Sequence, residues 1–268
     1  MQTISIDVLL LLVSAVGTRN WPTPRVRDGQ DDVLNEFPYV VSLQSAYFGR
    51  NDEDQEQYIS TLLRGCTGTL IGPNWVLTAA HCLDPYLSFV RFGNMTIPPS
   101  ATSLRKILKM ISHPSFKQVE NFPDYSCQND IALILIESLH MPSVGILSAV
   151  DYKTLVGRKV RYAGFGATVS SSDYDNRLDD EFRPLQLGEG VVVSCGHNLL
   201  EWRPAVCVAP KCSNARHDTM PGDSGGPLFH DEKIVAVVSG GESEPEGIYT
   251  PVSPYLTWIK TVMTENRS

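Results

Sequence analysis

Three short segments of the sequence carry side chains that could act together as a nucleophile, a base and an acid. His81 follows a β-rich run, and Asp130 precedes the most apolar of the predicted strands, 131–136. Ser224 lies in the glycine-rich segment Gly222–Pro227. A serine hydroxyl is a nucleophile at neutral pH only when a base takes its proton, and an imidazole oriented by a carboxylate is such a base. These residue types therefore predict acyl-transfer chemistry, provided that the fold brings them together.

Each of the three residues has a structural alternative when it is considered alone. A histidine at a strand end is more often structural than catalytic, and an aspartate beside an apolar strand can simply cap a turn. A serine among glycines is usually a turn residue. The glycines around Ser224 favour the catalytic interpretation, because they leave room for a substrate carbonyl and backbone N–H groups to face a developing oxyanion.

Short β-rich runs separated by turn residues must position these side chains. Glycine, proline and asparagine punctuate them, as in Gly72-Pro73-Asn74. Many short strands without intervening helical periodicity predict an all-β sandwich or barrel. After Pro254 the apolar residues fall at helical spacing, which predicts one amphipathic C-terminal helix. The β-rich runs are 39–43, 68–71, 75–78, 89–92, 131–136, 160–163, 191–193 and 234–238.

The composition excludes several classes of protein. With 42% hydrophobic and 19% charged residues, the 268-residue chain has the composition of a globular protein rather than of a disordered one. A formal net charge of −8 argues against a nucleic-acid partner, which requires basic surface. No apolar stretch is long enough to span a bilayer, so no membrane partner is expected. None of the six cysteines lies in a C-x-x-C pair, so we expect neither a metal nor another cofactor.

The N-terminus is typical of a secreted protein. An apolar run at 8–13 is followed by the small residues Ala15-Val16-Gly17, which predicts a signal peptide over residues 1–17. Asp7 and the lack of a preceding positive charge are atypical, and the alternative is a buried strand. Asn94 and Asn266 begin N-x-S/T sequences, which are candidate glycosylation sites in a secreted chain.

The three chemistry-bearing segments resemble the catalytic signatures of trypsin-like serine proteases, and they occur in the same chain order. The resemblance extends from about residue 26 to residue 263. It implies an all-β, chymotrypsin-like fold of two antiparallel six-stranded Greek-key β-barrels with a C-terminal helix. The peptidase domain would span 26–268. Its first barrel would span about 26–147, its second about 148–255, and its helix about 254–264.

The same resemblance implies a role for each catalytic residue. Ser224 would be the nucleophile, His81 the general base and then the general acid, and Asp130 the carboxylate that orients the histidine. The backbone N–H groups of Gly222 and Ser224 would form the oxyanion hole. The reaction would be peptide-bond hydrolysis through an acyl-enzyme.

The resemblance also implies activation from a zymogen. Cleavage after Arg25 would remove a propeptide of residues 18–25 and free Val26, whose α-ammonium would pair with Asp223. Such a buried ion pair can act as an activation switch, because a buried charge without its partner costs free energy. Arg27 and Asp28 depart from the family, which usually has Val and Gly there.

Asp218 matches the acidic residue at the base of the trypsin specificity pocket, which implies cleavage after Arg or Lys. Ser239, Gly241 and Gly247 match residues of the pocket walls. The alternative is that Asp218 is an ordinary loop acid. Three departures affect the pocket and the neighbouring subsites, and these are Met220 in place of a cysteine, Pro221 in place of a longer polar residue and Gly240 in place of a tryptophan.

The resemblance implies disulfides Cys66–Cys82 and Cys195–Cys207. Cys127 and Cys212 have no family counterpart, and a third pairing between them, Cys127–Cys212, is one of the alternatives. The family's calcium loop is not expected, because residues 94–112 contain no Asp or Glu.

The implied partners are a protein or peptide substrate, an activating protease and protein protease inhibitors, acting on a secreted, extracellular monomer. Acidic runs at 52–56 and 173–181 would border the cleft and favour a basic substrate. The rival is a non-enzymatic family member that binds a partner through the protease surface. A lipase or esterase is excluded by the motif order and by the lack of alternating helices.

Overall fold

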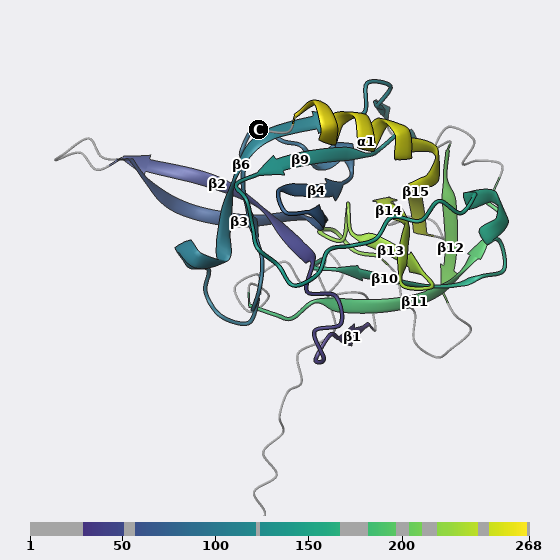
Figure 1. Ribbon diagram of the computed structural model, residues 1–268, viewed down its shortest axis with the longest axis horizontal. Helices are drawn as coiled ribbons and strands as arrows, with labels where there is room; N and C mark the ends of the chain where they lie inside the picture. Colours follow the sequence, from purple (N-terminus) through teal and green to yellow (C-terminus); the bar gives the residue numbers. More distant parts are fainter. Residues whose placement is uncertain are drawn as a thin grey trace, which may run out of the picture.

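The computed structural model describes residues 29–50, 57–121, 124–166, 182–196, 204–210, 219–240 and 247–266. The chain forms two closed six-stranded antiparallel β-barrels packed against each other, with one helix at the C-terminus (Figure 1). This architecture confirms the all-β fold of two barrels and a helix that the sequence predicts. In the part of the chain that the structure describes, no helix is both long and apolar enough to cross a membrane.

The first barrel is closed by strands whose inward residues share one core. In spatial order its strands are β2 (Val40–Arg50), β3 (Gln57–Gly72), β4 (Trp75–Thr78), β9 (Ala132–Ile136), β6 (Leu104–Ser112) and β5 (Leu87–Arg91), and β5 pairs again with β2. Leu43, Val76, Val90 and Ile134 are fully buried inside it. The predicted runs at the start of the chain therefore form β2 to β5 and β9, whereas β6 had no clear sequence pattern.

The second barrel repeats the arrangement with its own core. In spatial order its strands are β11 (Gln186–Val193), β10 (Lys159–Gly164), β13 (Pro227–His230), β14 (Lys233–Gly240), β15 (Gly247–Pro251) and β12 (Val206–Pro210), and β12 pairs again with β11. The short strand β1 (Gln30–Asp31) pairs with the start of β11. Leu228, Ala236 and Tyr249 are among the buried side chains of this core.

A further hydrophobic cluster joins the two barrels and the helix. It contains Leu77 and Leu133 from the first barrel and Phe229 from the second. It also contains Ile259 and Val262, which form the buried face of α1 (Leu256–Glu265). Because this cluster is continuous, the two barrels are held in a fixed relation. Residues at the barrel interface are therefore positioned by both halves of the chain.

Small elements connect the strands near that interface. A single 3-10 turn, η1 (Ala80–Cys82), follows β4. The hairpin of β7 (Lys117–Asn121) and β8 (Asp124–Gln128) precedes β9. The turns η2 (Ala101–Ser103) and η3 (Tyr152–Leu155) lie in loops, and η6 (Ser253–Tyr255) leads into α1.

Candidate active site

The strand pairing of the first barrel brings His81 to Asp130. His81 lies in the turn after β4, and Asp130 lies two residues before β9, which pairs with β4 so that Thr78 faces Ala132. The backbone N–H of His81 donates to Oδ1 of Asp130 at 2.9 Å, and the ring atom Nδ1 lies 2.7 Å from Oδ2. A carboxylate accepts, so Nδ1 carries the proton in this pair. Nε2 is consequently left to accept a proton from a substrate or nucleophile.

The Asp130 side chain is fully buried and held by more than the histidine. The hydroxyl of Ser239, on β14 of the second barrel, donates to Oδ2 of Asp130 at 2.5 Å. The preceding residue, Asn129, has a left-handed backbone with φ of 52°. Its amide accepts a hydrogen bond from Tyr255 and donates one to the carbonyl of Ser115, each at 2.9 Å. These contacts compensate the cost of burying the carboxylate and fix its position.

The turn that carries Ser224 needs its glycines. Gly222 and Gly225 have φ of 99° and 77°, a region that other residues rarely adopt. A Cβ at Gly225 would also lie 2.5 Å from a carbonyl oxygen of β3. The turn is fixed to β14 by hydrogen bonds from Gly225 N–H to the Val238 carbonyl and from Val238 N–H to the Gly226 carbonyl, both 2.8 Å.

Two backbone donors of this turn are available to a ligand. Within the described part of the chain, the N–H groups of Gly222 and Ser224 donate to no backbone or side-chain acceptor. The intervening N–H of Asp223 is used differently, because it donates to the carbonyl of Met220 at 2.9 Å. Two unused N–H groups in a tight turn are the arrangement that binds an oxyanion.

The Ser224 turn lies against the segment that carries His81. The carbonyl of Ser224 accepts a hydrogen bond from the N–H of Thr67 at 2.9 Å. Thr67 follows Cys66, and the disulfide from Cys66 to Cys82 ties it to the neighbour of His81. Both side chains are described, and no hydrogen bond yet joins the Ser224 hydroxyl to the histidine ring. Such catalytic hydrogen bonds are often completed only when a substrate binds.

The carboxyl group of Asp223, next to Ser224 in the chain, is completely buried. Its Oδ1 accepts from Gly166 N–H at 2.8 Å, and its Oδ2 accepts from Met220 N–H at 2.9 Å. Burial raises the pKa of Asp223 to about 7, although these two backbone donors act in the opposite direction. The carboxyl group is therefore in an environment that a cationic partner would stabilise strongly.

A family model described as Trypsin matches residues 26–259. The chain belongs to the trypsin family. It is a serine endopeptidase, and proteins or peptides are its substrates.

Curated relatives and a solved structure agree with this membership. The renal glandular kallikrein of Mastomys natalensis is 29% identical over 216 residues, which cover 75% of this chain and 81% of the relative. Mast cell protease 3 of Ovis aries is 26% identical, with 97% of this chain and 98% of the relative covered. The structure of neuropsin, a serine protease expressed in the limbic system of mouse brain, has a TM-score of 0.63 and 26% identity. It covers 88% of this chain and 98% of that chain.

Several predicted site residues of this trypsin-family chain lie outside the described residues. The acidic runs at 52–56 and 173–181, the signal peptide and the propeptide also lie outside them. Gly247 begins β15, and Ser239, on β14, donates a hydrogen bond to Asp130. The residues whose placement is not described are Arg25, Val26, Asp218, Gly241 and Cys212.

The structure contains the disulfides Cys66–Cys82 and Cys195–Cys207. Cys127 is buried, and the pairing Cys127–Cys212 stays a prediction. Sequence reasoning missed where Cys127 lies. Its sulfur, a ring nitrogen of His81 and a carboxylate oxygen of Asp130 lie within 4.8 Å of one another. The available clue was its place three residues before the aspartate.

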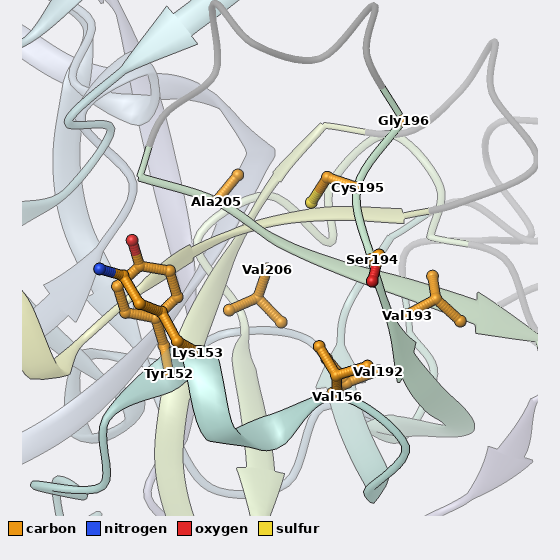
Figure 2. A pocket seen from close by; sticks show the side chains of 10 residues that line it. All are labelled: Tyr152, Lys153, Val156, Val192, Val193, Ser194, Cys195, Gly196, Ala205 and Val206. Atoms are coloured by element: carbon orange, nitrogen blue, oxygen red, sulfur yellow. The ribbon is translucent and has the colours of Figure 1, made fainter.

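A separate pocket of about 400 Å³ lies on the second barrel. Figure 2 shows Tyr152 and Lys153 on one side of it, with Val192, Cys195 and Val206 among its other lining residues. These residues come from η3, β11, β12 and the segment after β11 that contains Cys195, one end of the Cys195–Cys207 disulfide. No residue of the histidine, aspartate and serine constellation lines it, so it is distinct from the candidate active site.

Proposed function

We propose that the protein hydrolyses peptide bonds through an acyl-enzyme on Ser224, with His81 as the base and Asp130 as its orienting carboxylate. The observation that carries this proposal is the pair of hydrogen bonds from His81 to the buried Asp130, beside a turn with two unused N–H donors. This combination supplies a proton acceptor, its orientation and an oxyanion site in one place.

The chemistry follows from these atoms. Oγ of Ser224 attacks the scissile carbonyl carbon while Nε2 of His81 takes the hydroxyl proton. The carbonyl oxygen becomes an oxyanion and accepts from the N–H groups of Gly222 and Ser224. Collapse of this intermediate breaks the C–N bond, and His81 gives its proton to the departing amine. Water then attacks the acyl-enzyme with His81 again as the base, which releases the acid and restores Ser224.

The specificity we propose is cleavage after Arg or Lys, with Asp218 as the acidic partner of the substrate cation. Ser239 and Gly247 support a pocket here. They lie on the paired strands β14 and β15, which residues 241–246 connect in the chain. Met220 and Pro221 lie in the turn before the nucleophile, so their departures from the family act on this pocket and on the oxyanion turn.

We also propose a secreted zymogen that another protease cleaves after Arg25. The environment of Asp223 supports this, because a fully buried carboxyl with a raised pKa gains most from an ammonium partner such as that of Val26. Secretion is supported by the two disulfides and by the sequence pattern at residues 8–17. We expect the secreted enzyme to be a monomer that protein inhibitors can block.

The two candidate glycosylation sites differ in structure. Asn94 is exposed, and its Oδ1 accepts from both the N–H and the hydroxyl of Thr96, at 2.8 and 2.7 Å. The amide of Asn266 is already used, because it accepts from Lys109 and donates to the Val262 carbonyl. We therefore propose that Asn94 carries an N-glycan and that Asn266 is the poorer acceptor.

The test is hydrolysis of a peptide panel that varies the residue before the cut, with protein cleaved after Arg25 and with the same protein carrying Ser224→Ala. Cleavage after Arg or Lys that is absent from the variant supports the whole proposal. Cleavage after other residues retains the mechanism and rejects the role of Asp218. If neither protein cleaves any peptide of the panel, the proposed catalytic roles of Ser224, His81 and Asp130 are wrong.

A further inference from the structure

Thr67 makes an unusual set of contacts beneath the nucleophile turn. It lies on β3, one residue after the disulfide-bonded Cys66, and its side chain is fully buried. Its hydroxyl donates to the carbonyl of Gly222 at 2.8 Å and accepts from the N–H of Phe165 at 3.0 Å. Its backbone N–H donates to the carbonyl of Ser224 at 2.9 Å. One residue therefore contacts both residues whose N–H groups are unused.

The position of Thr67 is itself fixed by the barrels. Its carbonyl accepts from the hydroxyl of Thr78, on β4, at 2.9 Å. Its N–H and hydroxyl reach the nucleophile turn from the first barrel, whereas Phe165 follows β10 of the second. Thr67 is thus fixed by contacts to both barrels, and it can in turn restrict the conformation of the nucleophile turn.

The hydroxyl matters because of the freedom of Gly222. A glycine at φ of 99° has many alternative conformations, and rotation of its peptide units would move the oxyanion donors. The hydrogen bond from Thr67 to the Gly222 carbonyl fixes the peptide that follows this glycine. The hydrogen bond to the Ser224 carbonyl fixes the far end of the same turn. Together they restrict the two N–H groups to one geometry.

We propose that Thr67 is a positioning residue for the oxyanion hole, whose hydroxyl holds the Gly222 peptide so that the N–H groups of Gly222 and Ser224 point at the same oxygen. This inference rests on the proposed acyl-enzyme mechanism. Thr67 does not touch the substrate, and its effect is exerted through the turn. Loss of its hydroxyl would therefore weaken binding of the transition state more than binding of the substrate.

The chain offers a matched control two residues along the same strand. Thr69 is also fully buried on β3, and its hydroxyl has no hydrogen-bond partner among the residues that the structure describes. Thr69→Val thus replaces the same side chain in the same strand without removing a contact. Thr67→Val removes one donor and one acceptor function, and Thr67→Ser retains both.

The experiment compares activated wild type with Thr67→Val, Thr67→Ser and Thr69→Val on the best peptide of the panel. A tenfold to hundredfold fall in kcat with KM within about threefold is expected for Thr67→Val, below the loss of a whole oxyanion donor. Thr67→Ser and Thr69→Val should stay within about threefold of wild type. Affinity for a peptide aldehyde, which forms a tetrahedral adduct, should fall with kcat in Thr67→Val. Affinity for the matching peptide acid should not change.

Each outcome decides between explanations. If Thr67→Val does not fold, Thr67→Ala is compared with Thr67→Ser, because these two differ by one hydroxyl and the same fall in kcat is expected. Wild-type activity in the hydroxyl-free variants, or equal weakening of the aldehyde and the acid, overturns the inference. An inactive wild type with no adduct on Ser224 instead rejects the proposed function on which the inference rests.

Discussion

At the scale of single residues, His81 contacts Asp130 through its backbone and its ring at once. The backbone hydrogen bond, at 2.9 Å, places the start of the side chain, and the ring contact, at 2.7 Å, sets its rotation and tautomer. Ser239 adds a donor from the second barrel. The carboxylate therefore binds groups from both barrels. Its Oδ1 accepts from the His81 backbone, and its Oδ2 accepts from the His81 ring and from Ser239.

Asp130→Asn should remove most activity while leaving the fold intact. An amide has one acceptor oxygen, so it cannot serve all three donors, and the histidine ring loses its preferred tautomer. We expect kcat to fall on the order of 10⁴-fold, the loss caused by the same change in a trypsin-fold enzyme. Steady-state kinetics measures this. The control is Asp151→Asn, in an exposed turn, where no change is expected. A loss below tenfold for Asp130→Asn would contradict the assigned role.

The proposed catalytic residues could be singled out in the sequence because their motifs are local. Ser224 is surrounded by the glycines that its turn requires, and this pattern is visible within six residues. The role of Thr67 could not be predicted in this way. Its hydroxyl contacts Gly222, which is 155 positions away in the chain, and only barrel packing brings them together. The position of Cys127 beside the histidine was missed for the same reason.

At the scale of elements, the backbone of the loop after β10 lies very close to the carboxyl group of Asp223. A Cβ at Gly166 would lie 2.6 Å from Oδ1 of Asp223, and the N–H of Gly166 donates to that same oxygen. The loop after β10 and the turn before Ser224 therefore fit only if this position is a glycine. Displacement of either would change the oxyanion donors.

Gly166→Ala should consequently lower both stability and activity. Overpacking at such a site costs about 1–3 kcal/mol in the free energy of unfolding. Urea denaturation followed by fluorescence measures the stability, and peptide hydrolysis measures the activity. Gly65→Ala is the matched control, because its added Cβ would meet nothing closer than a Ser45 hydroxyl at 4.0 Å. Equal stability of the two variants would show that the contact to Asp223 is not restrictive.

The predicted strands agree with the structure where hydrophobic runs are buried on one or both faces. The apolar run at 131–136 forms β9, and 234–238 lies in β14, both with mostly buried side chains. β6 had no such pattern, because its residues are exposed or only half buried. The hairpin of β7 and β8 was also missed. Within the described ranges of the chain its strands pair only with each other, so polar sequences suffice to form it.

At the scale of the whole molecule, cleavage after Arg25 is proposed to act on Asp223 through the new α-ammonium group of Val26. In the uncleaved chain, the raised pKa of Asp223 means that the native state holds a proton that the unfolded state releases between about pH 4 and 7. The free energy of unfolding should therefore fall as the pH rises through that range, and then level off. An ammonium partner would lower this pKa and remove the fall.

The comparison is the melting temperature at pH 5 and at pH 7.5, for uncleaved and cleaved protein that both carry Ser224→Ala. Since the two samples share almost all titrating groups, the difference between them isolates the new pair. The uncleaved protein should lose more stability between the two pH values than the cleaved protein. Equal losses in both samples would contradict the pairing of Val26 with Asp223.

The most direct test of the catalytic assignment is to map where a fluorophosphonate attaches to the activated protein. The reagent phosphonylates an activated serine, and peptide mass spectrometry locates the adduct. The assignment predicts one adduct, on Ser224, that is absent in Ser224→Ala and formed much more slowly in Asp130→Asn. An adduct on another serine, or none on correctly cleaved protein, would contradict it.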